Sequence, residues 1–238
     1  QESFRVTSTV DMEKNSEYDL PDLIKSQYHV YLEDFNRINI FLTEFSNRNF
    51  IKNDIVNFID VGSGIGFMSF KLKESLSFLN MHLLEINKQK IDIGVDAFKP
   101  DLNNFTFHNE YLNSDFSERY NCYFDITFSF HVLEHVENVI EFVKSMYEIT
   151  KRGGHIIIEV PNQDDDLIGI SPEYSKIINF PAHVSNFTKK TLSFLIEKTG
   201  IDVSDVEYIP IQRYGFFNYI DWIRFDSKEH VLSDDYTP

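Results

Sequence analysis

One short segment constrains the fold of this chain more than any other. It is an apolar run over residues 55–59 that ends in Asp60. Three glycines follow at alternate positions, with a serine between the first two: Gly62, Ser63, Gly64 and Gly66. The pattern predicts a buried strand that turns sharply into a helix over residues 65–77, because glycine adopts the positive φ values of tight turns. The free N–H groups at the start of this helix would attract a carboxylate or a phosphate.

The spacing of the glycines separates two kinds of nucleotide site. The dinucleotide fingerprint G-x-G-x-x-G would put its third glycine at position 67, where this chain has Phe67. The third glycine is Gly66 instead, which disfavours a nicotinamide oxidoreductase. For the loop alone, a tight turn without any ligand remains the alternative.

Composition restricts the compartment and the partners. The 238 residues are 42% hydrophobic, which suits one elaborated domain or at most two, and no apolar run is long enough to span a membrane. Cys122 is the only cysteine, so we expect no internal disulfide and a cytoplasmic location. The 22 basic and 38 acidic residues give a net charge of −16, which opposes binding to nucleic acid or anionic membranes.

Strand and helix patterns alternate along the chain from residue 55. The expected strands cover residues 55–61, 80–85, 104–108, 124–130 and 155–160, and a sixth covers 201–211. The expected helices cover residues 65–77, 87–98, 136–150 and 188–199. Such alternation predicts a parallel sheet with helices on both faces and right-handed crossovers.

Segments outside this core are expected to cover it. Residues 1–50 form an N-terminal helical extension, because apolar residues over 20–45 recur at spacings of three and four. Residues 51–238 form the main domain, with an insert over 161–187 and an aromatic-rich tail over 213–225. The insert is long and holds few periodic positions, and such loops in compact domains are usually functional.

Further motifs follow at the ends of the expected strands. They are Met81–Glu85, Asn109–Tyr111, His131–His135, Gly153–Gly154, Val160–Asn162 and His183–Thr188. With the glycine loop, and over roughly residues 55–210, they resemble class I S-adenosylmethionine (SAM)-dependent methyltransferases. The chain is most similar to bacterial small-molecule methyltransferases with an H-V-L-E-H motif, which act in sugar, capsule and natural-product pathways.

The resemblance implies a Rossmann-like doubly wound sheet that binds SAM. Relatives end in an antiparallel seventh strand, and since this sequence stops at Pro238, either that strand is absent or the chain is truncated. The residues implied in cofactor binding are Asp60, Gly62, Ser63, Gly64, Gly66, Glu85, Ile86, Glu110, Tyr111 and Phe130. Glu85 would accept hydrogen bonds from the ribose hydroxyls, and Glu110 and Tyr111 would lie beside the adenine. Residues 27–31 would either reach the methionine end of SAM or only pack on the helix's apolar face.

The string His131-x-x-Glu134-His135 has three interpretations. It matches the H-x-x-E-H of inverted zinc proteases, but that motif needs a helix of its own and this one ends a strand. It also resembles the E-x-x-E-H site of metal-dependent methyltransferases, with His131 in place of the first Glu and His183 as the later ligand. A divalent metal would then lie among His131, Glu134, His135 and His183. Third, the histidines act without a metal or are purely structural.

Methyl transfer to a hydroxyl explains why histidines would be needed. The sulfonium is already activated, so the protein orients the acceptor and removes its proton. Histidine accepts a proton near neutrality, whereas a metal would lower the pKa of the hydroxyl itself. His183 in the insert is the first choice for a base, and His131 and His135 are second.

The leading hypothesis is therefore a SAM-dependent O-methyltransferase that acts on a small polar acceptor. A sugar, a sugar nucleotide or a phosphoramidate-type capsule precursor would fit the resemblance, and a homodimer is compatible with it. The alternatives are a metal-dependent RNA 2′-O-methyltransferase, which the acidic balance disfavours, and a non-enzymatic SAM-binding partner subunit.

Overall fold

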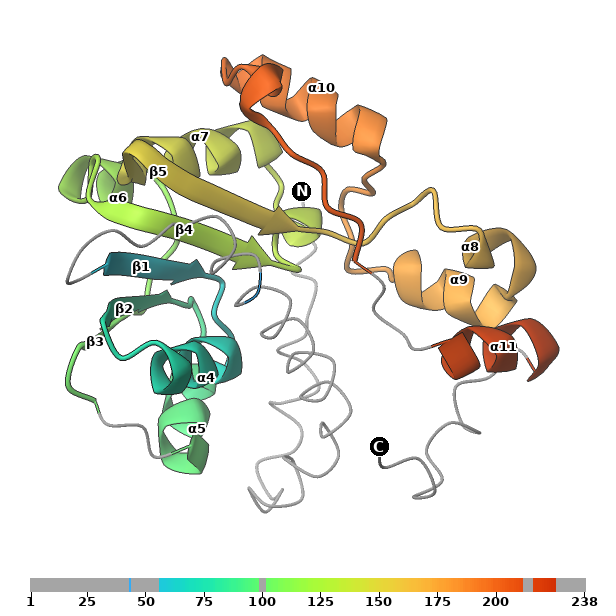
Figure 1. Ribbon diagram of the computed structural model, residues 1–238, viewed down its shortest axis with the longest axis horizontal. Helices are drawn as coiled ribbons and strands as arrows, with labels where there is room; N and C mark the ends of the chain where they lie inside the picture. The colour runs from blue at the N-terminus through green and yellow to red at the C-terminus, as the bar shows by residue number, and fades with distance from the viewer. Residues whose placement is uncertain (1–42, 44–55, 99–101, 212–215, 226–238) are drawn as a thin grey trace, which may run out of the picture.

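Five parallel strands form the centre of the molecule (Figure 1). The computed structural model describes residues 43, 56–98, 102–211 and 216–225. The strands are β1 (Val56–Val61), β2 (Leu79–Leu84), β3 (Phe105–His108), β4 (Phe124–Phe130) and β5 (Thr150–Glu159). Their order in the sheet is β3-β2-β1-β4-β5, and every pair is parallel. This arrangement confirms the expected Rossmann-like fold. The strand order reverses between β1 and β4, and such folds bind ligands at the carboxyl ends of the strands beside this point.

Helices cover both faces of the sheet. The first face packs against α4 (Phe67–Ser75) and α5 (Lys88–Phe98), and the second against α6 (Ser114–Arg119), α7 (Val139–Ile149) and α10 (Lys189–Thr199). In β1, Phe58 belongs to the first core cluster and Ile59 to the second, and both side chains are fully buried. A strand buried on both faces needs the continuous apolar run that the sequence has.

The boundary between α7 and β5 differs from the prediction. The expected helix over 136–150 is shorter in the structure: α7 begins at Val139 and ends at Ile149, after a separate 3-10 turn, η1 (Leu133–His135). β5 starts at Thr150 rather than at residue 155. Thr150 pairs with Phe124 across a register shift, so the glycine pair lies inside an irregular strand instead of forming the turn before it. The Thr150 hydroxyl donates to the carbonyl of Met146 at 2.6 Å, which ties the strand start to the helix end.

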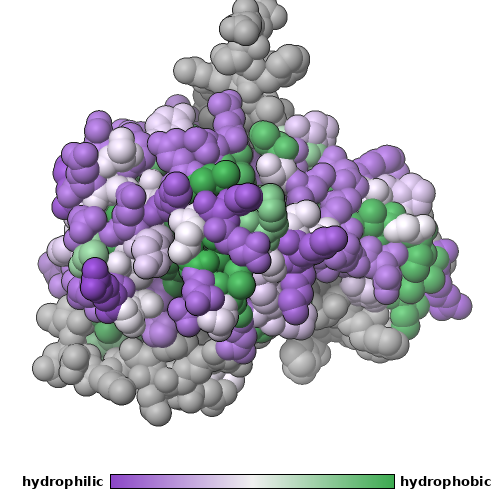
Figure 2. Space-filling view, turned by 90° about the horizontal axis from the view of Figure 1, so that it is seen from above, coloured by the Kyte–Doolittle hydropathy of each residue, from purple (hydrophilic) through white to green (hydrophobic). Residues whose placement is uncertain are grey.

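The insert folds into short helices with a small core of their own. These are α8 (Leu167–Ile170) and α9 (Pro172–Ile178), and α11 (Phe216–Phe225) packs against them through Trp222. Figure 2 shows hydrophobic surface at this end of the molecule, where Ile170, Ile177 and Ile223 are exposed.

The predicted sixth strand over 201–211 is wrong. These residues contain only the 3-10 turn η2 (Val203–Asp205) and irregular backbone. The Asp202 side chain accepts a hydrogen bond from the Ser204 N–H at 2.9 Å, which bends the chain. Pro210 further on offers no N–H for a ladder. The alternating apolar pattern was present, but no described strand pairs with it.

Several predictions fall on other parts of the chain. The N-terminal extension over 1–50, apart from Thr43, and the proposed contacts of residues 27–31 lie outside the described residues. Residues 212–215 and 226–238 at the tail also lie outside them. Within the described part, no helix is both long enough and apolar enough to cross a membrane.

Candidate cofactor and acceptor site

The glycine loop lies at the carboxyl end of β1, where its three glycines all have positive φ. At Gly62 a Cβ atom would lie 2.3 Å from Cγ2 of Val132, so this loop is in direct contact with the segment that follows β4. At Gly64, φ is 58° and an added Cβ would meet no heavy atom within 4 Å. The loop is therefore closed against the protein at Gly62 and open at Gly64.

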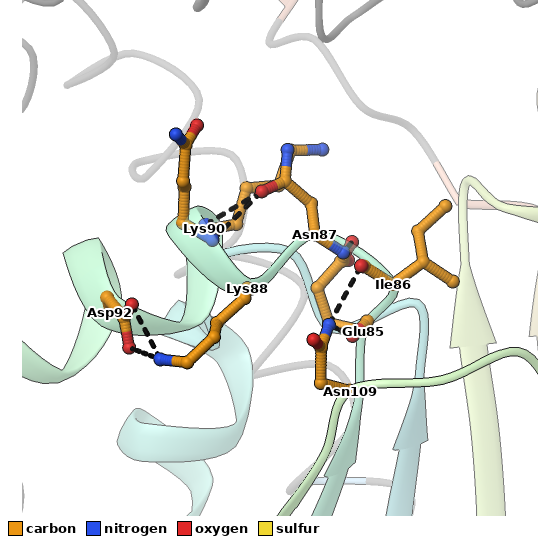
Figure 3. A network of polar contacts seen from close by, with 8 residues as sticks. Glu85, Ile86, Asn87, Lys88, Lys90, Asp92 and Asn109 are labelled. Atoms are coloured by element: carbon orange, nitrogen blue, oxygen red, sulfur yellow. Dashed lines mark hydrogen bonds and ion pairs between the residues drawn. The ribbon is translucent and has the colours of Figure 1, made fainter.

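Glu85 connects the ends of the first two strands. Its carboxylate accepts a hydrogen bond from the N–H of Gly64 at 2.8 Å through Oε2 and from the N–H of Asn87 at 2.9 Å through Oε1. Asn109, after β3, donates to the carbonyls of Glu85 and Ile86 at 2.9 and 2.8 Å (Figure 3). Each carboxylate oxygen has a second lone pair, so Glu85 retains acceptors for two hydroxyl groups.

The remaining predicted cofactor residues divide into two groups. Asp60 is buried and accepts a hydrogen bond from the Ser69 hydroxyl at 2.6 Å, which fixes the start of α4. Glu110 forms an ion pair with Arg119. In contrast, Ile86 and Tyr111 are 51% and 66% exposed, and Phe130 is half-buried. Exposed apolar side chains next to Glu85 and Glu110 in the sequence are suited to contact an aromatic base.

Gly94 is a site residue that the sequence analysis missed. It lies in α5, and a Cβ there would approach the carbonyl oxygen of Ile65 to 1.8 Å. This glycine therefore allows the helix to pack directly on the backbone of the glycine loop. A lone glycine in the middle of a helical pattern was the available signal.

The sequence analysis also missed a buried pair of histidines, one in β2 and one at the end of β3. His82 and His108 are 4% and 7% exposed, and Nδ1 of His82 lies 2.9 Å from Nε2 of His108. Burial, and then repulsion from His108, lowers the pKa of His82 to about 4. Burial also lowers the pKa of His108, while Glu110 raises it and Arg119 lowers it further. Both rings are therefore neutral at physiological pH.

Three of the four predicted metal-ligating residues lie close together, two in the η1 turn after β4 and one in the insert. Glu134, His135 and His183 each offer one ligand atom, and these atoms lie within 4.8 Å of one another. Glu134 is 1% exposed, and its Oε2 has no hydrogen-bond partner. Nδ1 of His135 donates to the Ala182 carbonyl at 2.9 Å. Nδ1 of His183 donates to the carbonyl of Ile178 at 2.7 Å, so in both rings Nε2 is the nitrogen left to bind.

Backbone hydrogen bonds dock the insert on this cluster. The carbonyl of Glu134 accepts from the N–H groups of Val184 and Ser185 at 2.7 and 3.1 Å. A β-bridge between Asn162 and Phe187 closes the base of the insert. His183 therefore reaches His135, with ring centroids 4.9 Å apart, although 48 positions separate them in the sequence.

His131 lies outside the three-residue cluster. Its Nδ1 is 3.1 Å from Oε1 of Glu134, and its Nε2 is 2.9 Å from Oε1 of Glu159. Each ring nitrogen thus has a carboxylate partner, which leaves neither as a metal ligand in this arrangement. Its φ of 55° is in the left-handed region, which is uncommon for residues other than glycine.

A methyltransferase-domain family matches residues 26–206 of the chain. The chain belongs to this family. A search of the curated proteins finds no match.

Solved structures of methyltransferases share the fold. An O-methyltransferase family protein from Burkholderia thailandensis is 13% identical with a TM-score of 0.54, covering 67% of this chain and 48% of its own. Phosphoethanolamine N-methyltransferase 2 from Haemonchus contortus, solved with SAM, is 14% identical with a TM-score of 0.56, covering 82% and 45%. A SAM-dependent methyltransferase from Archaeoglobus fulgidus is 15% identical with a TM-score of 0.50, covering 76% and 81%. The chain thus spans about half the length of the first two.

The residues of the loop fit the cofactor of this family. Gly64 has open space where a side chain would otherwise lie. The Ser63 hydroxyl has no hydrogen-bond partner and is shielded from solvent. The Glu85 carboxylate lies against the same loop and keeps lone pairs for the ribose hydroxyls. Open backbone, an unpartnered hydroxyl and a fixed acid are what a nucleoside ligand requires.

Proposed function

We propose that this protein is a SAM-dependent methyltransferase that moves a methyl group to a hydroxyl oxygen of a small polar acceptor. The observation that carries the proposal is the close approach of Gly62 to Val132, because Val132 directly precedes the η1 turn that contains Glu134 and His135. Bound SAM supplies a methyl group already activated on a sulfonium. The residues of the chain must then orient the acceptor and take up its proton.

His183 is our first candidate for the base. The carbonyl of Ile178 holds the proton on Nδ1 of His183, so the lone pair is on Nε2. His135 has the same arrangement through the carbonyl of Ala182 and is the second candidate. His131 is weaker than either, because both of its ring nitrogens already lie against carboxylates.

A divalent metal held by Glu134, His135 and His183 is the alternative way to activate the hydroxyl. Two imidazoles and one carboxylate suit several divalent ions. The unpartnered Oε2 of the buried Glu134 supports the alternative, because a buried carboxylate oxygen is costly without a proton donor or a cation. A metal there would lower the pKa of a hydroxyl bound to it. The predicted set of four ligands becomes three, without His131.

The acceptor class rests on the resemblance to sugar, capsule and natural-product methyltransferases. A sugar, a sugar nucleotide or a phosphoramidate-type capsule precursor remains our proposal, with the enzyme in the cytoplasm and a homodimer as a compatible assembly. The solved relatives include proteins named as O- and N-methyltransferases, so the fold leaves the acceptor atom open. RNA is disfavoured by the charge of −16. The convergence of ligand atoms in one site favours an enzyme over a partner subunit.

Calorimetry with S-adenosylhomocysteine tests the cofactor half of this proposal. Wild-type protein should bind it, and Gly64→Arg should abolish binding by filling the open side of the loop. Gly153→Arg is the matched control, because Gly153 also has a positive φ and open space but lies at the start of β5, far from the loop. Absence of wild-type binding would refute the proposal.

Methyl transfer from labelled SAM to a panel of sugars, nucleotide sugars and short RNA tests the acceptor half. If His183 is the base, His183→Gln should lose most of the rate and a chelator should have no effect. If a metal acts, the chelator should abolish transfer and the metal should restore it. Labelling of RNA alone would contradict a small acceptor.

A further inference from the structure

We propose that His131 is a positioning residue: it holds the Glu134 carboxylate in place for a cation, and Glu159 anchors His131 in turn. The inference rests on the metal-dependent form of the proposed function. It assigns His131 to neither of the roles that its motif suggests, since it is not a ligand and not the base.

The ring of His131 bridges two acidic side chains from different elements. Glu134 lies in η1 after β4, and Glu159 is the last residue of β5. Nδ1 of the ring lies 3.1 Å from Oε1 of Glu134, and Nε2 lies 2.9 Å from Oε1 of Glu159. Both ring nitrogens are therefore within hydrogen-bond distance of a carboxylate, so the ring is held from two sides.

This bridge determines which oxygen of Glu134 is available. Oε1 accepts from His131, whereas Oε2 has no hydrogen-bond partner and the side chain is almost fully buried. A metal-binding carboxylate must be ionised and held in a fixed orientation. The contact with His131 fixes the orientation, and it leaves Oε2 for an ion shared with His135 and His183.

Glu159 holds the backbone as well as the ring of His131. Its carbonyl accepts the His131 N–H at 3.0 Å, in addition to the side-chain contact. The chain turns between these contacts with φ of 55° at His131, a conformation that costs energy for a residue with a Cβ. Strain of this kind persists where the surrounding contacts require it, and it clusters at functional sites.

Two amides can separate the two contacts of the ring. An asparagine side chain carries its N–H₂ close to the position of Nδ1, and a glutamine side chain carries it close to that of Nε2. We therefore expect His131→Asn to keep the donor to Glu134 and His131→Gln to keep only the donor to Glu159. His131→Gly removes both donors and is compatible with the left-handed backbone.

The test is a titration with Co²⁺, followed by its visible absorption, on the purified protein and these three variants. We expect His131→Asn to bind Co²⁺ within about threefold of wild type, while His131→Gln and His131→Gly lose about 10- to 100-fold, as is common when outer-shell partners are removed. Calorimetry with S-adenosylhomocysteine on the same samples should give unchanged affinities, which shows that the cofactor site is folded.

Equal Co²⁺ affinities for His131→Asn and His131→Gln would overturn the inference. Wild-type protein that binds S-adenosylhomocysteine but no Co²⁺ would also overturn the inference. That result would be consistent with a methyltransferase that uses no metal. Wild-type protein that binds Co²⁺ but no S-adenosylhomocysteine would refute the proposed function and leave the role of His131 supported.

Discussion

The carboxylate of Glu85 accepts a hydrogen bond from the backbone N–H of Gly64 at 2.8 Å. This contact joins the end of β2 to the loop after β1. Because β1 and β2 are neighbours in the sheet, an acid at the end of β2 reaches the backbone of the glycine loop. The proposed cofactor site is therefore held together by a contact within the protein.

Glu85→Ala should weaken S-adenosylhomocysteine binding by at least tenfold. Hydrogen bonds to a charged group contribute about 1.5–3 kcal/mol each, and about 1.4 kcal/mol corresponds to a factor of ten. Glu74→Ala is the control, because Glu74 is an exposed residue of α4 whose ion pair, among the described residues, is with the neighbouring Lys71. Calorimetry measures both variants. Equal affinities for the two would show that Glu85 supports the fold but not the ligand.

Gly94→Ala should destabilise the protein by about 1–3 kcal/mol, the usual cost of inserting a methyl group into a packed contact. The added Cβ would lie 1.8 Å from the carbonyl oxygen of Ile65, so either α5 or the glycine loop must move. Cofactor affinity should fall with stability. Urea unfolding followed by circular dichroism gives the free energy of unfolding.

Gly169→Ala provides the comparison for Gly94→Ala. Gly169 is also helical, but a Cβ there would meet nothing within 4 Å. We expect an unchanged or slightly higher free energy of unfolding, since alanine favours a helix over glycine by about 1 kcal/mol. A loss as large as that of Gly94→Ala would mean that the contact with Ile65 is not the cause.

The features that the sequence predicted are those with local signals. The apolar run, the glycines and Glu85 each follow from residues close in sequence, and the parallel sheet follows from the alternation of strands and helices. Features that depend on distant partners were not predicted: the packing of Gly94 depends on Ile65, and the second contact of the His131 ring depends on Glu159. The predicted strand over 201–211 failed for the same reason, since its pattern is local but a strand needs a neighbour.

Stability should fall as the pH is lowered from about 6.5 to 4, because His82 and His108 must take up protons inside the core. The pKa of His82 is about 4 in the folded protein, against 6.5 for a free histidine. The unfolded chain therefore binds more protons over this interval, and acid favours unfolding by on the order of 3 kcal/mol for His82. Above pH 6.5, His82 is mostly neutral in both the folded and the unfolded protein, so its effect on stability no longer changes with pH.

His82→Phe removes the proton-binding group from the same volume. Its free energy of unfolding should depend less on pH between 6.5 and 4 than that of wild type. Glu110 raises the pKa of His108 and Arg119 lowers it, and both are kept in the variant, so they should not produce the difference. Parallel pH profiles for the two proteins would contradict this origin.

Asp165 should control the docking of α11 on the insert. Its carboxylate accepts hydrogen bonds from the phenol groups of Tyr174, at 2.7 Å, and Tyr219, at 3.1 Å. Trp222 of α11 is 3% exposed in the same small core and is the only tryptophan of the chain, so its fluorescence reports on this contact alone. Asp165→Ala should shift the emission of Trp222 to longer wavelength as the indole meets water.

The sheet and the helices that cover it should tolerate Asp165→Ala, because their two core clusters contain none of these residues. The urea midpoint by circular dichroism should change little, while the fluorescence transition moves to lower urea. Asp164→Ala, at an exposed neighbouring position, should change neither signal. If both probes move together after Asp165→Ala, the insert and the sheet unfold as one cooperative unit, and the small core depends on the large one.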